Sequence, residues 1–591
     1  MMPAIHHRSR LANALAGAAA LVLGTEGLAL RADVDPAVLQ AESARVEVIR
    51  AASRCAVSIF AGDAGGGSGV LISPDGYALT NFHVVESAGP ALRCGLDDGR
   101  LYDAVLVGLD PTGDVAMIRL LGRDDFPHAT PADSDAVQPG DFCFAAGNPF
   151  LLATDLQPSI SVGIISGVHR YQFPAGTILE YADCIQVDAA INPGNSGGGL
   201  FDEAGRLVGV NGRASFEKRG RVNVGVGYAI SMNQLRNFSG LLKGGRLVDH
   251  ATLGATVSSS ADGRVLVSDI LQSSDAWRRG LRYDDEIVAL AGRPVRTVNA
   301  FKNVLGTLPA GWRVPLAYRR AGRRHDIVVR LAGVHSAAAL AALVTGAPEP
   351  PQAGPDGRAP EPRPPESRRP STEAARLPEA IRGLYDPRPG FINAHFNTVE
   401  RDRVAASIAQ SRAAATSAAW EFTGVRAEGG RFRLVLADDD AAIDLPTGTS
   451  QIDPAGDLTA DPAPPGSGGL LAALAIWRRL VRSGPAAMGS TTYWGTAPRD
   501  PQAFAAGFAA ELIDVLEVSV SGMTAQVAVD AGGGVTQVEL WTDADAEPCR
   551  VRFGSPSPDD PRGLPTRFDV TRGDEVFGTF IVEPPAEEGG P

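Results

Sequence analysis

Short runs in which hydrophobic and polar residues alternate follow one another between residues 67 and 331. Gly, Pro, Asn and Asp separate these runs, which is typical of β-strands joined by turns. The pattern predicts strands at 67–72, 77–79, 115–120, 265–270, 314–320 and 325–331. A helix is predicted at 298–305. This part of the chain is therefore expected to be mainly β.

The pattern of residues 381–591 predicts both helices and strands. Helices are expected at 397–414 and, as an amphipathic segment, at 470–481. Alternating strands are expected at 420–425, 431–436, 516–520, 525–529, 538–541 and 577–582. Glycine or proline turns separate them. We therefore expect an α+β C-terminal domain of unknown function, with an antiparallel sheet and one or two helices packed on it.

Two segments are predicted to lie outside the folded domains. Residues 336–380 are rich in proline and poor in apolar residues, so they are expected to form a disordered linker. Residues 1–32 are predicted to be a signal peptide, because the basic segment 6–10 precedes a short apolar core at 11–23. Retention of that segment as an uncleaved N-terminal anchor stays open, and no later segment is expected to span a membrane.

Composition narrows the function. The 591 residues are 44% hydrophobic and 21% charged, which is enough for roughly three to four folded domains. The net charge of −14 and the pI of about 5.2 argue against nucleic-acid binding. The sequence shows no phosphate-binding loop, no dinucleotide fingerprint and no zinc-site spacing, so no cofactor and no metal are expected. Five scattered cysteines do not form a disulfide framework, and several are expected to be buried thiols.

Three residues at strand ends suggest nucleophilic catalysis. Ser196 lies in the glycine-flanked segment 192–198, where glycines permit a tight turn that points N–H groups at an oxyanion. His83 follows the strand at 77–79, and Asp114 opens the strand at 115–120. Each residue alone is more often a turn or surface residue. The order His, Asp, Ser is nevertheless that of the chymotrypsin-like double barrels, in which a histidine activates the serine and an acid orients the histidine.

The segments around these residues resemble the HtrA/Deg family of serine proteases. The matching motifs are 67–72, 97–104, 147–149, 161–166 and 188–198. The resemblance implies a chymotrypsin-like double six-stranded β-barrel protease domain over residues 33–245. It implies His83 as general base, Asp114 as its orienting acid and an oxyanion hole at Gly194, Asn195 and Ser196. Asp110 competes for the acid role, but the family motif favours Asp114. Gly199 stands where the family usually has Pro or Ala.

The same resemblance implies a small, uncharged substrate pocket. Its floor would be Ala190, and one wall would include Ala229 and Ile230 in the segment 227–230. Such a pocket prefers small aliphatic side chains and discriminates weakly between them. The simpler interpretation of Ala229 and Ile230 is that they belong to the barrel core.

Residues 246–335 resemble the PDZ domain that follows the protease in this family, most clearly at 276–287. PDZ domains bind a peptide C-terminus as an added strand. The resemblance implies that Leu253, Gly254, Ala255 and Thr256 form the loop that holds the carboxylate. The family usually has a bulkier apolar residue at the position of Ala255. A PDZ-shaped spacer that packs on the barrel is the alternative.

Together these features predict an exported serine endopeptidase of the periplasm or cell envelope. Its expected substrates are unfolded or misfolded proteins, and its PDZ domain would bind peptide C-termini. A homotrimer is carried over from the family only as an expectation. One alternative is a protease-fold binding or scaffold protein that cleaves little. Another is a signalling protease that cleaves a single partner.

Overall fold

The computed structural model describes residues 34–60, 66–148, 156–172, 179–216, 223–345, 377–411, 418–456, 458, 462–505, 507, 509–543, 546–556 and 563–584. The predicted signal peptide and the centre of the predicted linker (346–376) lie outside these residues. The chain divides into two compact units, Met1–Arg50 and Ala51–Pro591. Helix α2 (Pro36–Ser53) begins in the first unit and is mostly exposed there. Within the described ranges, no helix has both the length and the apolar character of a membrane span.

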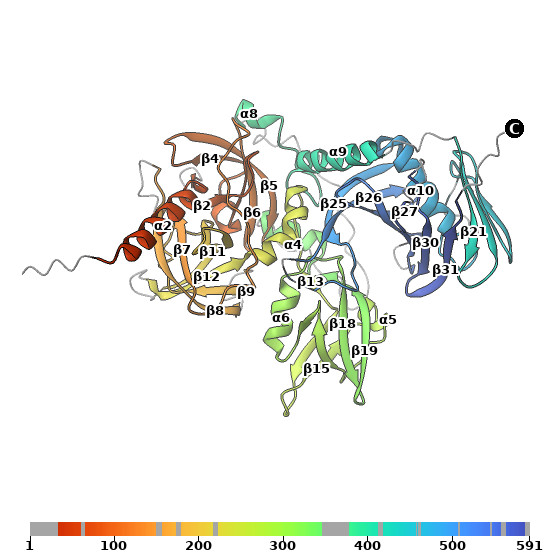
Figure 1. Ribbon diagram of the computed structural model, residues 1–591, viewed down its shortest axis with the longest axis horizontal. Helices are drawn as coiled ribbons and strands as arrows, with labels where there is room; N and C mark the ends of the chain where they lie inside the picture. Colours follow the sequence, from red (N-terminus) through yellow and green to blue (C-terminus); the bar gives the residue numbers. More distant parts are fainter. Residues whose placement is uncertain are drawn as a thin grey trace, which may run out of the picture. The chain divides into compact units, whose positions relative to one another are not determined.

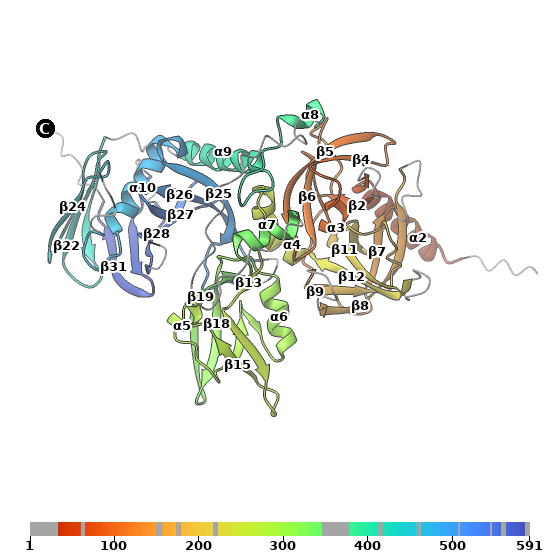
Figure 2. The same ribbon diagram turned by 180° about the vertical axis from the view of Figure 1, so that it is seen from behind.

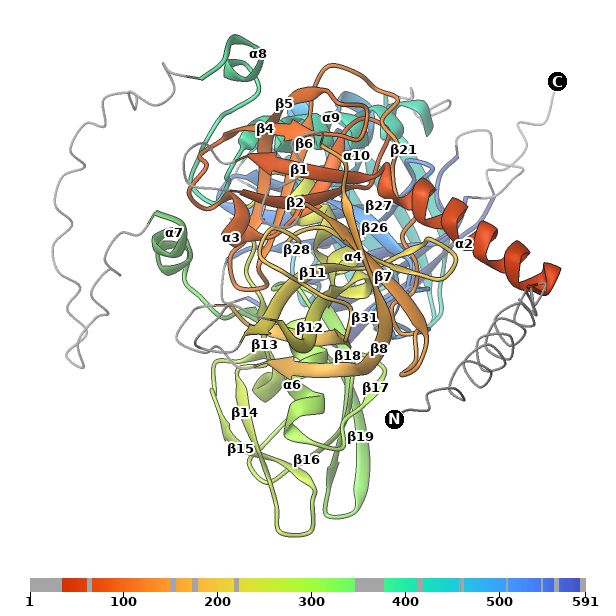
Figure 3. The same cartoon turned by 90° about the vertical axis from the view of Figure 1, so that its left-hand side faces the viewer.

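Two closed barrels of six strands each begin the second unit, as the fold prediction required. The first barrel has the order β1-β2-β3-β6-β5-β4, and the second has the order β10-β11-β12-β9-β8-β7. Figure 3 shows strands of both barrels from the left-hand side of Figure 1. The strands of the first barrel are β1 (Ala56–Phe60), β2 (Gly66–Leu71), β3 (Tyr77–Thr80), β4 (Ala91–Gly95), β5 (Leu101–Asp110) and β6 (Val115–Leu120). Those of the second are β7 (Phe142–Gly147), β8 (Ser159–Gln172), β9 (Tyr181–Val187), β10 (Gly199–Asp202), β11 (Leu207–Phe216) and β12 (Asn223–Ser231).

Two helices accompany the barrels. The single-turn helix α3 (Phe82–Val85) follows β3, and α4 (Met232–Lys243) follows β12. The Ser231 side chain caps α4 by accepting a hydrogen bond from the Gln234 N–H, which satisfies one of the free donors at a helix start. Because α4 packs against β5, β11 and β12, it holds the two barrels together from one side.

A smaller sheet follows the barrels, and we call residues 246–335 the middle region. Its strand order is β14-β15-β16-β18-β19, with β17 paired to β16 and β13 paired separately to β20. Its elements are β13 (Ala251–Thr252), β14 (Ala255–Ser259), β15 (Val265–Ile270), α5 (Asp275–Arg278), β16 (Glu286–Leu290), β17 (Arg293–Pro294), α6 (Val298–Gly306), β18 (Arg313–Arg320), β19 (Arg323–Arg330) and β20 (Ala332–Gly333). The predicted helix at 298–305 and the final hairpin are confirmed. Helix α7 (Ala337–Thr345) forms inside the predicted linker.

The C-terminal sheet has eleven antiparallel strands in the order β24-β23-β22-β21-β31-β30-β29-β28-β27-β26-β25, and Figures 1 and 2 show its two sides. The helices are α8 (Glu379–Arg382), α9 (Ala394–Ser411), α10 (Leu470–Ser483) and the 3-10 turn η4 (Pro485–Ala487). The strands are β21 (Trp420–Arg426), β22 (Arg431–Leu436), β23 (Ala441–Leu445), β24 (Gly448–Ile452), β25 (Ser490–Pro498), β26 (Leu512–Val520), β27 (Met523–Val529), β28 (Val535–Trp541), β29 (Cys549–Phe553), β30 (Arg567–Arg572) and β31 (Glu575–Val582). The predicted antiparallel sheet with packed helices is confirmed.

One face of this sheet is buried in a hydrophobic core, and the other face is more polar. Along β27 the burial alternates, so that Ala525 and Val527 face the core and Gln526 faces the opposite side. Helix α10 supplies buried residues to that core on almost its whole circumference, including Leu474 and Trp477. All five cysteines are free and buried, as the composition indicated.

Candidate active site

His83 and Asp114 lie against each other at the end of the first barrel. His83 belongs to the one-turn helix α3, and its Nδ1 lies 2.8 Å from Asp114 Oδ2 and 2.9 Å from Oδ1. The backbone N–H of His83 also donates to Asp114 Oδ1, at 3.1 Å. The histidine side chain is 39% exposed, whereas the Asp114 side chain is fully buried. The Nδ1 edge of the imidazole ring is therefore held by a buried carboxylate, while the ring stays accessible.

The turn before β6 holds Asp114 in an unusual conformation. Its φ is +58°, which costs a non-glycine residue about 1–2 kcal/mol, although aspartate tolerates it better than most. Asn81 Nδ2 donates to the Asp114 carbonyl at 3.0 Å, and the Tyr181 hydroxyl donates to its carboxylate. These contacts hold the carboxylate toward His83.

Asp110, the competing acid, has a different partner. Its Oδ2 lies 2.8 Å from His250 Nε2, and its Oδ1 accepts a hydrogen bond from the Gly113 N–H at 2.8 Å. Both side chains of this pair are buried. Asp110 thus shapes the turn that presents Asp114, and Asp114 is the acid that contacts the candidate base.

Ser196 lies in the turn between β9 and β10, where two glycines are required. Gly194 and Gly197 have φ values of +101° and +87°, which other residues rarely adopt. A Cβ on Gly197 would lie 2.1 Å from the Ser68 carbonyl oxygen and 2.4 Å from Thr80 Oγ1. The Ser196 turn is therefore packed directly against β2 and the strand that leads into His83.

Hydrogen bonds join this turn to Ser68 of β2. The Ser196 carbonyl accepts the Ser68 N–H at 2.9 Å, and the Gly194 carbonyl accepts the Ser68 hydroxyl at 2.6 Å. The amide N–H groups of Gly194 and Ser196 donate to no other described residue. The Asn195 N–H, in contrast, donates to the Asn192 carbonyl at 2.9 Å. Two of the three predicted oxyanion donors are thus unengaged, and the third closes the turn.

The Ser196 hydroxyl donates to the Gly212 carbonyl oxygen, 3.2 Å away. In this resting arrangement its proton is directed to the backbone of β11 and away from the imidazole. Rotation about a single side-chain bond redirects a serine hydroxyl.

The electrostatic environment of His83 favours its charged form. Burial lowers the pKa of His83, but the hydrogen bond from its ring to Asp114 and the charge of that carboxylate raise it more, with a smaller contribution from Glu86. The net pKa lies above the ordinary value. A carboxylate that stabilises the imidazolium in this way supports a histidine that accepts a proton during a reaction.

The predicted pocket residues lie near this turn with different exposure. Ala190 is exposed, and its carbonyl accepts a hydrogen bond from Asn195 Nδ2 at 3.3 Å. Ala229 and Ile230 are both fully buried in β12. Because successive strand residues point to opposite faces, only one of this pair can face a pocket. Ala229 belongs to the core of the second barrel.

The predicted peptide-binding loop connects β13 to β14. Leu253 is buried, and Gly254 has a φ of +68°. The Gly254 carbonyl accepts the Leu271 N–H at 2.8 Å. Strand β14 lies at the edge of the middle sheet, and its Ala255 pairs with Ile270 of β15.

Comparison with known proteins agrees with this geometry. Residues 67–210 match the family model described as "Trypsin-like peptidase domain". A probable periplasmic serine endoprotease DegP-like of Chlamydia trachomatis is 37% identical over 294 residues, which cover 48% of this chain and 56% of the relative. The periplasmic serine endoprotease DegP of Escherichia coli K12 is 35% identical over 277 residues, covering 45% of this chain and 56% of DegP. The chain contains a trypsin-like peptidase domain homologous to the DegP serine endoproteases.

The matches cover part of the chain and part of the relatives. The chain spans about half the length of the curated relatives it matches. A solved structure described as "HtrA-type protease AlgW with tripeptide" is similar to 49% of this chain, with 29% identity, a coverage of 96% of its own chain and a TM-score of 0.41.

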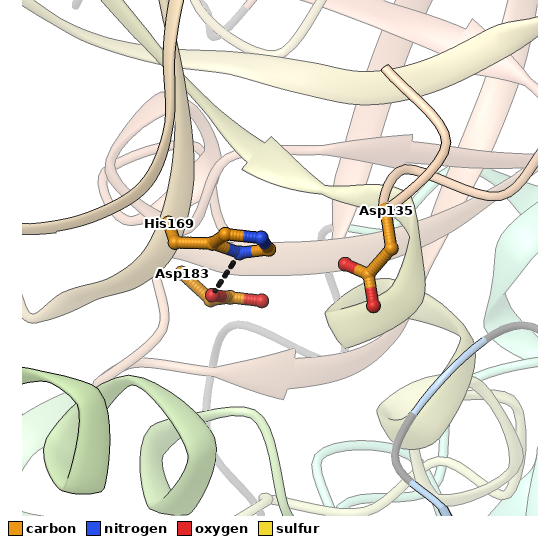
Figure 4. A group of neighbouring side chains, drawn as sticks. All are labelled: Asp135, His169 and Asp183. Atoms are coloured by element: carbon orange, nitrogen blue, oxygen red, sulfur yellow. Dashed lines mark hydrogen bonds and ion pairs between the residues drawn. The ribbon is translucent and has the colours of Figure 1, made fainter. Parts of the chain in front are cut away.

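A second group of titratable residues lies where the peptidase domain meets the middle region. Ligand atoms of Asp135, His169 and Asp183 lie within 4.8 Å of one another, and Figure 4 shows the contact between His169 and Asp183. The Arg293 guanidinium donates to Asp183 Oδ2 at 2.8 Å and lies 2.9 Å from His169 Nδ1. A fixed guanidinium repels a cation at this point, so the group is best described as an ion-pair network.

Sequence reasoning missed two residues of the candidate site. Tyr181, which donates to Asp114, opens β9 some 67 positions along the chain, and His250, which pairs with Asp110, follows α4. Neither lies in a motif, and contacts this distant along the chain leave no periodic signal. The only indication in the sequence was that Tyr181 and His250 are polar residues beside the ends of strands.

Proposed function

We propose that the protein is an exported serine endopeptidase that cleaves unfolded or damaged proteins after small aliphatic residues. The observation that carries the proposal is the buried contact between Asp114 and His83 Nδ1, with the Ser196 turn packed against the strand that leads into His83. The peptidase match over 67–210 includes all three residues. Homology to proteins named serine endoproteases supports the same activity.

The proposed mechanism assigns one task to each group. With Nδ1 held by Asp114, the Nε2 atom of His83 is left to accept the Ser196 proton once the hydroxyl turns away from Gly212. The hydroxyl oxygen attacks the scissile carbonyl and forms an acyl-enzyme, and the imidazolium protonates the leaving amine. Water then hydrolyses the acyl-enzyme: His83 accepts a proton from the water and afterwards returns it to Ser196. The amide N–H groups of Gly194 and Ser196 would stabilise the oxyanion, with each donor contributing about 10²–10³ in rate.

Substrate choice follows from the uncharged surroundings of Ser196. Ala190 at the pocket floor and Ala229 at its wall leave room for a small aliphatic side chain, and neither supplies a charge. Ala229 would then serve both as pocket wall and as part of the core of the second barrel, while Ile230, on the opposite face of β12, faces away from the pocket. Such a pocket discriminates weakly, so scattered cleavage of exposed apolar segments is expected.

The remaining regions are proposed to serve this activity. The middle region is proposed to be a PDZ domain, spanning 246–335, whose outer strand β14 and loop at Leu253–Thr256 would bind peptide C-termini. A location in the periplasm or cell envelope is supported by the names of the homologues, which are described as periplasmic. Assembly into a homotrimer is proposed from family resemblance alone.

The main competing function is a binding protein that retains the protease fold. A narrow signalling protease is a second alternative. The unengaged N–H groups of Gly194 and Ser196 favour an enzyme, because a scaffold has no need of free donors beside a serine.

Digestion of casein separates these possibilities. The wild type should degrade casein into many fragments, Ser196→Ala should be inactive, and Ser519→Ala, which changes an exposed serine of β26, should match the wild type. Equal digestion by Ser196→Ala and wild type would reject the peptidase assignment. A single cleavage product would favour the signalling protease over quality control.

A further inference from the structure

A cavity of about 280 Å³ lies between the middle region and the C-terminal sheet, away from the candidate active site. From the middle region, Trp312, Arg313 and Arg330 line it. From the C-terminal sheet it is lined by residues of β25 to β29, including Gln526 on the polar face of β27. Its volume is close to the lower end of the range for small-molecule sites.

The charge of the cavity wall is strongly one-sided. Four arginines line it together with a single carboxylate, Glu539: Arg313, Arg330, Arg499 and Arg552. Both oxygens of Glu539 are already engaged, one by Arg330 and the other by Arg550 at 2.9 Å. Arg330 is thus paired with Glu539 and Arg499 with Glu511, at 2.7 Å, so the weakly paired positive charge of the wall comes from Arg313 and Arg552.

Two of these arginines have weak carboxylate partners or none. Arg313 is 14% exposed, and the acid nearest to it is Asp574, 3.8 Å away and half exposed. Burial and, to a smaller extent, the neighbouring charge of Arg550 lower the pKa of Arg313 to about 10, against the opposing charges of Glu539 and Asp574. Arg552 is exposed at the cavity, and no carboxylate in the described part of the chain pairs with it. An anion in the cavity would relieve this repulsion.

Aromatic residues of the wall, which lie beside polar ones such as Gln526 and Gln537, continue into a second cavity. Trp312, Trp494 and Phe553 line the first cavity. The adjacent cavity, of about 260 Å³, shares Phe553 and four other lining residues with it. Trp477 and Leu564 are among its other lining residues. The arginine-lined cavity thus adjoins one lined by Trp420, Trp477 and Leu564, with Asp530 as its carboxylate.

We propose that these two cavities form a binding site for an organic anion that carries a carboxylate or phosphate group on a single aliphatic chain. The arginines of the first cavity bind the anionic group, because guanidinium matches carboxylate and phosphate with paired hydrogen bonds. The aliphatic chain lies along Phe553 and enters the second cavity, where burial of apolar surface stabilises it. This site is separate from the proposed protease chemistry.

Titration of the full-length Ser196→Ala protein tests the site without self-cleavage. The readout is intrinsic tryptophan fluorescence, since four tryptophans line the two cavities. The probes are sodium dodecanoate and dodecyl phosphate, each below its micelle concentration; their relative affinities distinguish a carboxylate from a phosphate ligand. Saturable binding of at least one is expected, with hexanoate at least 10-fold weaker and dodecyltrimethylammonium without saturable binding.

Matched arginine variants locate the anion. Arg552→Gln changes an exposed side chain and should weaken binding of the preferred anion at least 5-fold, while Arg433→Gln, at an exposed ion pair of β22, should leave binding unchanged. The proposal is overturned if neither anion saturates, if the cationic probe binds equally well, or if both variants weaken binding alike.

Discussion

At the scale of single residues, the structure selects one acid for the base. Asp114 and Asp110 lie four positions apart, yet only Asp114 contacts His83, because Asp110 is already paired with His250. The positive φ of Asp114 and the hydroxyl of Tyr181 direct its carboxylate to the imidazole Nδ1. Orientation of the ring therefore depends on a few polar contacts of a buried turn.

Replacing the acid should separate orientation from folding. Asp114→Asn keeps the size of the side chain but removes the charge that fixes the ring tautomer, so kcat on a peptide substrate should fall by about 10⁴. Asp98→Asn, at an exposed position of the hairpin between β4 and β5, should leave kcat unchanged. Near-wild-type kcat in Asp114→Asn would show that another group orients His83.

The raised pKa of His83 predicts the pH dependence of activity. A general base must be neutral to accept a proton, and the net effect of Asp114 holds the imidazolium to a higher pH than usual. The ratio kcat/KM should therefore rise with pH, with a midpoint above the ordinary histidine value of about 6.5. Steady-state rates between pH 5 and 9 measure it, and a midpoint below 6.5 would contradict the assignment.

At the scale of elements, the turn at Ser196 depends on glycine for two reasons. Gly197 combines a φ of +87° with a lack of space for any Cβ, whereas Gly99 has a φ of +75° with open space around it. Gly99→Ala should therefore show only the backbone cost, about 1–2 kcal/mol. Gly197→Ala should in addition displace the turn and lower kcat/KM by about 10²-fold, since such misplacement near the chemistry is costly.

Thermal melting and peptide kinetics on both glycine variants check this prediction. Both proteins should still fold, with the larger loss of activity in Gly197→Ala. Equal kcat/KM in the two variants would show that the close contact between Gly197 and Ser68 does not position the nucleophile.

The barrels and the C-terminal sheet were predictable to different degrees. Alternation revealed β21, β22 and β27, because each has one face in the core. The helix α10 was predicted from its apolar residues, and it is buried on almost its whole circumference. The strand β25 was missed, because Gly495 interrupts its pattern, Pro498 ends it, and its pairing with β26 contains a bulge. The helix α7 was also missed, because proline-rich neighbours dominated the composition of that stretch. Alternation identifies a strand only where one of its faces is regularly buried.

The candidate site shows the same division. The glycine-flanked serine and the order of His83, Asp114 and Ser196 identify the chemistry, because the tight turn imposes its own sequence. The pairing of Asp110 with His250 and the resting hydrogen bond of Ser196 to Gly212 arise from tertiary contacts. The glycine at position 199 has a local explanation, because a Cβ there would lie 2.6 Å from the ring of Phe201.

At the scale of the whole molecule, the ion-pair network couples the second barrel to the middle region. The Asn303 side chain of α6 adds two hydrogen bonds, accepting the Asp183 N–H and donating to the His169 carbonyl. The hydrogen bond to Asp183 raises the pKa of His169, against the opposing effects of burial and of Arg293. The carboxylate of Asp135 lies close to His169 and favours the charged form of its imidazole.

This network predicts a pH-dependent stability. Because the folded-state pKa of His169 is raised, its stabilising contribution is complete below about pH 6.5 and is lost as pH rises through the higher folded-state value. His169→Asn, which tolerates the φ of +54°, should therefore lower the melting temperature more at pH 5.5 than at pH 8.5. His128→Asn, at an exposed position, should show no such difference, and an equal loss for His169→Asn at both pH values would contradict the coupling.

The most direct test of the whole account is to map where a fluorophosphonate probe attaches to the full-length protein. Such probes react with a serine that a neighbouring base activates. Mass spectrometry of the labelled protein should place the adduct on Ser196, and Asp114→Asn should slow the labelling. Labelling at a different serine, or undiminished labelling of Ser196→Ala, would contradict the assignment of His83, Asp114 and Ser196 as one catalytic group.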